Sequence, residues 1–209
     1  HRPDLNTPIV ETVAAMTDLV RQGKILYWGT SEWTARDIAL AHAAAARDNL
    51  VAPVMEQPQY NLFTRECFEV DYSRLYKEVG LGTTVWSPLS RGELVGHYLE
   101  EKGGKFVVSK QGNAWLKEAG LPPGYEARVK QVAAFACIAR ELEITPARLA
   151  LAWVLKNSNV TTAILGASNT NHLKENLKAI GDVSLLTNAV MGQIESIFQT
   201  SPVPEETFR

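Results

Sequence analysis

Apolar positions recur at helical spacing over much of the chain. Apolar residues recur every three or four positions between Pro8 and Gly23, which predicts a helix. The Thr7 hydroxyl can cap this helix, Pro8 fits its first turn, and Gly23 fits its end. The same spacing predicts a helix over 146–157 with Thr145 as its cap. Further helices are predicted over 34–49, 65–79, 126–141, 170–180 and 188–199.

Short apolar runs separate several of these helices and predict strands. They are uniformly apolar, as in parallel strands covered on both faces, and they occupy 24–29, 52–57, 82–87 and 161–166. The pattern therefore predicts an α/β fold built from β/α units. It leaves two architectures open. One is part of a (β/α)8 barrel, which needs eight strands and about 250 residues. The other is an open four-stranded sheet.

One stretch does not follow the β/α alternation. Residues 99–124 are rich in Gly, Pro and Lys, which predicts an irregular insert or lid between the third strand and the next core helix. Residues 1–209 are expected to form a single domain that contains this insert.

Composition and charge narrow the function classes. The chain has 209 residues, 45% of them hydrophobic and 21% charged, and a formal net charge of −2. Such a balance argues against a nucleic-acid partner, and no apolar run approaches the roughly 20 residues that span a bilayer. Cys67 and Cys137 lack metal-site or disulfide spacing, so we expect free thiols, no metal and a reducing, cytoplasmic location.

Polar and aromatic residues follow each predicted strand. They are Thr30-Ser31, Gln57, the segment 86–89 and the segment 166–169. Because the carboxyl ends of parallel strands meet at one edge of a sheet, these groups suit a flat, polar, phosphorylated ligand, with an anion at the helix start near Asn169.

Each of these residues also has a purely structural interpretation. Asn169 or Thr170 can cap a helix, and Trp86 can be a core aromatic residue. Ser31 and Ser87 also suit ordinary turns, and Glu32 and Arg91 also suit solvated loops.

Five ordered motifs give the chain a family resemblance. "RPDLNTP", "YWGTSEW", "EQPQYNLF", "WSPLSRG" and "ILGASN" followed by "LKENL" resemble the aldo-keto reductases, most closely the branch with voltage-gated potassium channel β subunits. The resemblance covers essentially the whole chain. It implies a (β/α)8 barrel that reduces aldehydes or ketones with NADP(H), of which this chain carries the second half, strands 5–8 with their helices.

The resemblance also implies roles for individual residues. His1, directly before "RPD", matches the histidine of the catalytic tetrad, whose Asp, Tyr and Lys are expected upstream of this sequence. We therefore expect the chain alone to be inactive. The cofactor-binding positions implied by the motifs are Ser31 and Gln57 for the carboxamide, Trp86 for the nicotinamide face, Ser87, Leu89 and Arg91 for the pyrophosphate, and Gly166, Ser168, His172, Glu175 and Asn176 for the adenosine and its 2′-phosphate.

Some positions depart from the channel-subunit pattern. Glu32 stands where those proteins usually have Arg, His172 replaces Gln, and His97 replaces Lys. Lys105 and Lys110 in the insert are candidates to restore the lost positive charge. The resemblance thus implies a reductase with a small carbonyl substrate or, alternatively, a redox-sensing regulatory subunit that binds a channel's cytoplasmic domain. An open barrel edge would favour a homo-oligomer.

Overall fold

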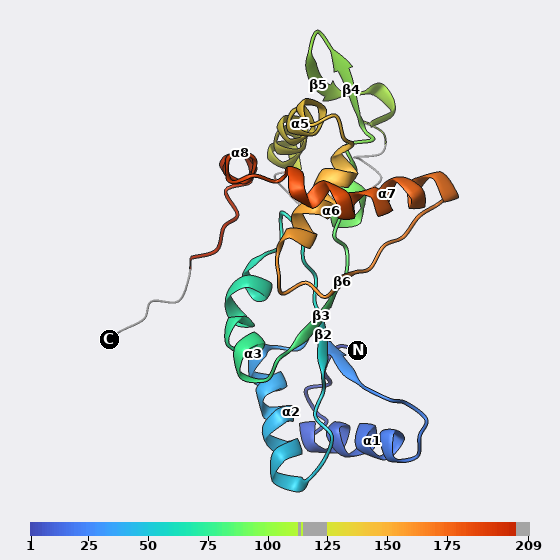
Figure 1. The fold of residues 1–209 in the computed structure, drawn as a ribbon, viewed down its shortest axis with the longest axis vertical. Helices are drawn as coiled ribbons and strands as arrows, with labels where there is room; N and C mark the ends of the chain where they lie inside the picture. The colour runs from blue at the N-terminus through green and yellow to red at the C-terminus, as the bar shows by residue number, and fades with distance from the viewer. Residues whose placement is uncertain (113, 115–124, 204–209) are drawn as a thin grey trace.

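The molecule is elongated, with short strands at its middle and helices toward both ends (Figure 1). The structure is a computed structural model and describes residues 1–112, 114 and 125–203. The N-terminus lies beside the strands, whereas the last described residues extend away from α8 (Figure 1).

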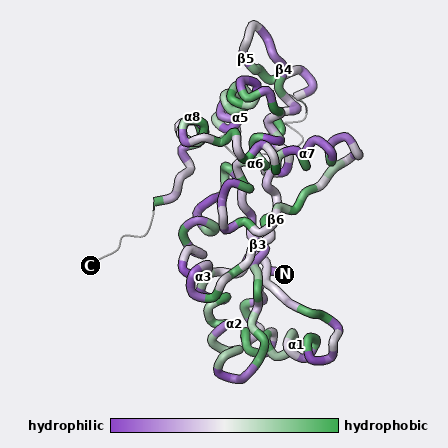
Figure 2. Tube along the Cα trace, in the orientation of Figure 1, coloured by the Kyte–Doolittle hydropathy of each residue, from purple (hydrophilic) through white to green (hydrophobic). Residues whose placement is uncertain are grey.

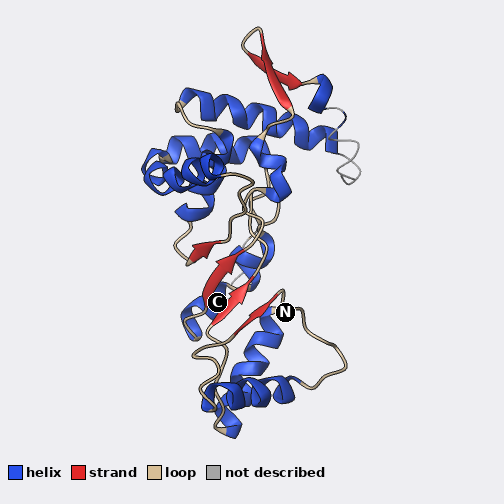
Figure 3. Ribbon diagram, turned by 90° about the vertical axis from the view of Figure 1, so that its right-hand side faces the viewer, coloured by secondary structure: helices blue, strands red, loops and turns tan. Residues whose placement is uncertain are grey.

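A four-stranded parallel sheet forms the centre of the fold. Its strands are β1 (Gly29–Ser31), β2 (Met55–Gln57), β3 (Gly82–Val85) and β6 (Thr162–Ala163), arranged in the order β1-β2-β3-β6. Ser31 lies opposite Gln57, and Val85 lies opposite Ala163, so the carboxyl ends of neighbouring strands are level. Figure 3 shows the strands running through the middle of the molecule. The predicted α/β class with parallel strands is confirmed.

The helices lie in or close to the ranges that the sequence predicts. They are α1 (Ile9–Arg21), α2 (Ala35–Asp48), α3 (Ser73–Glu78), α5 (Tyr125–Glu141), α6 (Pro146–Lys156), α7 (Thr170–Asp182) and α8 (Asn188–Phe198). The predicted cap of α6 is present, because the Thr145 hydroxyl accepts a hydrogen bond from the N–H of Arg148. The helix predicted over 65–79 is divided instead into a π-helical turn, Cys67–Asp71, and α3.

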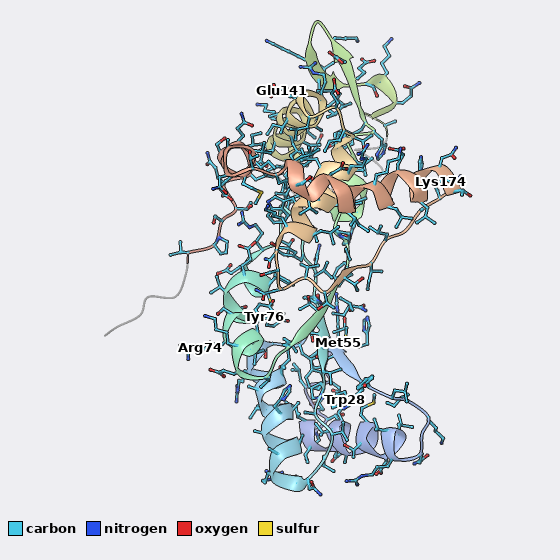
Figure 4. The ribbon with its side chains drawn as sticks, viewed as in Figure 1. Trp28, Met55, Arg74, Tyr76, Glu141 and Lys174 are labelled. Carbon is cyan, nitrogen blue, oxygen red and sulfur yellow. The ribbon has the colours of Figure 1, made fainter. Side chains whose placement is uncertain are left out.

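The buried apolar side chains form two clusters. The first lies around α1 and α2 and includes Val13, Trp28 and Ile38; the second lies around α5, α6 and α8. Figure 2 shows hydrophobic segments in both places. Tyr76 on α3, labelled in Figure 4, packs against both clusters, and its hydroxyl donates to the Phe68 carbonyl at 2.8 Å. The sheet and α3 therefore join the two ends of the molecule.

The first strand begins later than the apolar run 24–29 predicts. Leu26 and Tyr27 are 81% and 75% exposed, and only from Gly29 does the chain enter the sheet. Trp28 turns inward, and its indole N–H donates to the Val51 carbonyl at 2.9 Å. Figure 4 shows Trp28 near Met55. The prediction of a strand over 24–29 is therefore wrong except at its last residue, because the rest of the apolar run lies before the point where the chain enters the sheet.

The other strands lie within their predicted ranges but are shorter. Trp86, predicted to end the third strand, makes only an isolated bridge to Gln59.

Part of the predicted irregular insert is regular. Strands β4 (Leu99–Lys102) and β5 (Lys105–Val108) form an antiparallel hairpin whose turn uses Gly103 and Gly104 at φ of 58° and 76°. The hairpin lies beside α5 and extends away from the sheet (Figure 1). Residues 113 and 115–124 of the insert lie outside the described residues.

None of the helices in the described part of the chain combines the length and the apolar character needed to cross a bilayer.

Candidate functional site

The ends of β1 and β2 bring two predicted site residues together. The Ser31 hydroxyl donates to the Gln57 backbone carbonyl at 3.0 Å, and the Gln57 amide nitrogen lies 3.5 Å from the Thr84 hydroxyl of β3. Ser31 is buried and Gln57 is half-buried. Polar side chains of three adjacent strands thus form a continuous row at one edge of the sheet.

Trp86 is fixed at the end of β3 by its backbone and by its side chain. Its N–H donates to the Pro58 carbonyl at 3.0 Å, and its indole Nε1–H donates to Glu32 Oε1 at 2.8 Å. The same Glu32 oxygen accepts the backbone N–H of Gln59 at 2.9 Å. Glu32 is thus a half-buried residue that binds two neighbouring strand ends, and its interpretation as a solvated loop charge is wrong.

The segment after Trp86 has an unusual backbone. Ser87, Ser90, Arg91 and Gly92 have φ of 53°, 49°, 54° and 92°, in the left-handed region. The Ser87 hydroxyl accepts the Arg91 N–H at 3.0 Å, and the Gly92 N–H donates to Leu89 at 3.0 Å. Left-handed residues other than glycine cost about 1 kcal/mol or more each and concentrate at binding sites. Because these N–H groups are used within the loop, an anion here would depend on side chains.

A cavity of about 540 Å³ lies between this loop and the segment after β6. A volume of this size is in the range of ligand sites. A Cβ built on Gly166 would meet nothing within 4 Å, so this glycine borders open space. The predicted cofactor residues that line this cavity are Trp86, Ser87, Leu89, Arg91 and Gly166.

A second cavity, of about 600 Å³, shares Val95 with the first. Glu175 lines it, together with Arg140 and Arg148, which the sequence motifs did not indicate. Both arginines already have carboxylate partners. Arg148 contacts Asp182 at 2.6 and 2.7 Å, and Arg140 contacts Glu101 at 2.6 Å. They were missed because no local motif marks them, and because their carboxylate partners lie 39 and 34 positions away in the chain.

The start of α7 carries the remaining predicted residues. Asn169 caps this helix, since its side-chain oxygen accepts the His172 N–H at 2.9 Å, which confirms the capping role considered for it. The Ser168 hydroxyl and His172 Nδ1 are 3.1 Å apart and exposed, whereas Asn176 is buried. Ser168, His172 and Asn176 are not among the residues lining the two cavities, although they lie on the segment that borders both.

His1 lies close to the strand ends through its backbone. Its carbonyl accepts the indole N–H of Trp33 at 2.9 Å, and Trp33 follows β1 by two residues. His1 itself is exposed.

The buried tyrosines do not provide an accessible acid. The Tyr60 hydroxyl donates to Glu69 at 2.7 Å, and the Tyr98 hydroxyl donates to the Glu93 carbonyl at 3.0 Å. Both rings are 1% exposed, and burial raises the pKa of each hydroxyl well above its usual value. Neither residue lines the two cavities, so neither is placed to protonate a ligand there.

These features define an α/β protein with a candidate ligand site at the carboxyl ends of its parallel strands. A family model described as "Aldo/keto reductase family" matches residues 1–199, so the chain belongs to the aldo/keto reductase family. The family resemblance predicted from the motifs is confirmed.

Curated relatives with channel-subunit names match the chain closely. It is 41% identical over its full length to a "Probable voltage-gated potassium channel subunit beta" of Arabidopsis thaliana, and 41% identical to a protein of the same name from Oryza sativa subsp. japonica. It is 42% identical, over 97% of its length, to a "Putative voltage-gated potassium channel subunit beta" of Schizosaccharomyces pombe. The chain spans only 59–63% of the length of these relatives.

Proposed function

We propose that the protein is an NADP(H)-dependent reductase of aldehydes and ketones, and that this chain supplies the cofactor-binding part. The observation that carries the proposal is the cavity bordered by Trp86, Ser87, Arg91 and Gly166. Ser31 and Gln57 do not line it, but the indole of Trp86 is bonded to Glu32, the residue after Ser31. An indole surface, amide and hydroxyl groups and a cation are the chemistry that a nicotinamide dinucleotide requires.

The sheet, in this proposal, forms strands 5–8 of a (β/α)8 barrel. Its support is the parallel order β1-β2-β3-β6, with each strand beside the next one of the central sheet along the chain. Family membership implies the barrel, and the relatives are long enough to contain further β/α units.

The residues act by binding and orienting. Ser31 and Gln57 hold the carboxamide, and Trp86 covers one ring face and excludes water from it. When bound, the cofactor supplies the hydride. Ser87, Leu89 and Arg91 line the path of the phosphates. The adenosine end is assigned to Gly166, Ser168, His172, Glu175 and Asn176.

His1 is proposed to position the carbonyl group, because its backbone is fixed near the end of β1. The chain alone is expected to reduce carbonyl compounds negligibly, since Tyr60 and Tyr98 are buried away from the cavities. We place the protein in the cytoplasm, where its cysteines would stay reduced.

Cofactor binding tests the proposal directly. Titration of the purified chain with NADPH, followed by nucleotide fluorescence, should show binding that Trp86→Ala weakens at least tenfold. Tyr27→Ala is the control, because Tyr27 is 75% exposed and lies outside the site. Circular dichroism establishes that both variants fold. A folded wild-type chain that does not bind NADPH would overturn the proposal.

The names of the relatives favour a second candidate function. The protein would then be a regulatory subunit that senses redox state through bound NADP(H) and binds the cytoplasmic part of a potassium channel. Co-purification of the protein with such a channel domain, together with very slow carbonyl turnover by the longer protein, would support this function. Fast turnover without channel binding would support the reductase.

A further inference from the structure

Glu32 has no role in the cofactor contacts assigned above, although it lies beside them. It follows Ser31 in a left-handed conformation, with φ of 58°, which turns its side chain back across the sheet edge. Its Oε1 accepts two hydrogen bonds, from Trp86 Nε1 at 2.8 Å and from the Gln59 N–H at 2.9 Å. The loop therefore places a carboxylate at the edge of the indole that borders the cavity.

The surroundings leave this negative charge without a compensating cation. Both donors to Glu32 are neutral N–H groups, and within the described residues no lysine or arginine forms an ion pair with Glu32. The negative charge of Glu32 also acts on the buried Glu56. Burial raises the pKa of Glu56, and the charge of Glu32 contributes in the same direction.

The charge also acts through the indole. A carboxylate that accepts the Nε1–H draws positive charge toward the ring edge and leaves the ring face more negative. A negative ring face attracts cations. The oxidised nicotinamide ring carries a positive charge, whereas the reduced ring is neutral.

We propose that Glu32, through its own charge and through Trp86, makes the site bind the oxidised nicotinamide cofactor more tightly relative to the reduced one. The inference rests on the proposed function, because it assumes that the ring lies against Trp86. By linkage, such a preference lowers the reduction potential of the bound cofactor and makes it a stronger hydride donor.

The test compares Kd values of NADP⁺ and NADPH for the folded chain by calorimetry. Glu32→Gln removes the charge but retains a side-chain oxygen that can accept from Trp86 and Gln59. It should weaken NADP⁺ binding on the order of fivefold, the size of a partly screened attraction between unit charges, and leave NADPH binding nearly unchanged. Glu66→Gln is the matched control, because Glu66 is exposed and does not line the cavity beside Trp86.

The outcomes separate the inference from the proposed function. If both cofactor forms bind and their Kd ratio is the same in the wild type and in Glu32→Gln, the inference is overturned while the proposed function stands. If neither form binds the folded wild-type chain, both are overturned. If Glu32→Gln unfolds, the test uses Glu32→Asp, which keeps the charge but shortens the side chain. This variant should still bind NADP⁺ more tightly relative to NADPH. Loss of that preference with an unchanged affinity for NADPH would contradict the inference.

Discussion

At the scale of single residues, the partner of a side chain decides its role more than its type does. Ser31 and Glu32 are adjacent; from the sequence, Ser31 also suits an ordinary turn and Glu32 a solvated loop. In the structure Ser31 bonds to Gln57, while Glu32 crosses to Trp86 and Gln59. The motif containing both residues was visible in the sequence. The contact between Glu32 and Trp86 was not, because 54 positions separate them in the chain.

Gly29 is needed because two strands approach closely at its position. A Cβ there would lie 2.1 Å from the Met55 sulfur and 2.6 Å from the Met55 carbonyl oxygen. We expect Gly29→Ala to lower the free energy of unfolding by about 1–3 kcal/mol, since the backbone oxygen cannot move without disturbing the ladder.

Urea denaturation measures this effect. Gly181→Ala on α7 is the control, because nothing lies within 4 Å of its added Cβ. There the higher helix propensity of alanine should raise stability by up to about 1 kcal/mol. Equal stability changes in the two variants would contradict the packing argument.

At the scale of elements, helix signals were more reliable than strand signals. Thr145 accepts the N–H of Arg148, so α6 begins where this predicted cap places it. Thr34 caps α2 at the start of the predicted range 34–49. The predicted Thr7 cap is wrong, because α1 begins at Ile9 behind Pro8 with no side-chain cap. Caps are local interactions, so the sequence contains them. The prediction of a strand over 24–29 was wrong because an apolar run does not indicate which of its residues will pair with a neighbouring strand.

Arg148 of α6 forms ion pairs with two carboxylates of α7, Asp182 at 2.6 Å and Glu175 at 3.8 Å. Arg148 on α6 holds Asp182, which is 6% exposed, through two hydrogen bonds. Arg148→Met leaves the buried Asp182 without its cation, and Asp182→Asn removes the charge of the nearer carboxylate while Glu175 stays 3.8 Å from Arg148. Each is expected to lower the free energy of unfolding by about 1–2 kcal/mol.

A double-mutant cycle separates this coupling from side effects. The exposed pair Arg47–Asp48 serves as the control and should show a coupling energy below about 0.5 kcal/mol. If the coupling energy of Arg148 with Asp182 is equally small, the pair does not hold α7 in place.

At the scale of the whole molecule, the sheet has two open edges. In the described chain β1 pairs with β2 alone, and β6 pairs with β3 alone. Large apolar side chains are also exposed, among them Leu26 and Tyr27 before β1, Ile164 after β6, and Leu177 and Ile180 on α7. Unpaired edges and apolar surface of this kind favour association.

We therefore expect the 209-residue chain to self-associate in solution. Light scattering should show dimers or larger species whose proportion rises with concentration. The double variant Leu177→Glu/Ile180→Glu should shift the distribution toward the monomer, because it places charge on the exposed face of α7. A monodisperse wild-type monomer with a sharp thermal transition would contradict this expectation.

The sequence by itself determined the α/β class, most helices, the polar character of the strand ends and the family, because local spacing and motifs carry that information. Only the tertiary structure decided which strand-end residues share a cavity and where Arg148 lies. It also decided that Glu32 contacts Trp86. These features depend on contacts between distant segments, which form when the strands pair and the loops after them turn toward one another.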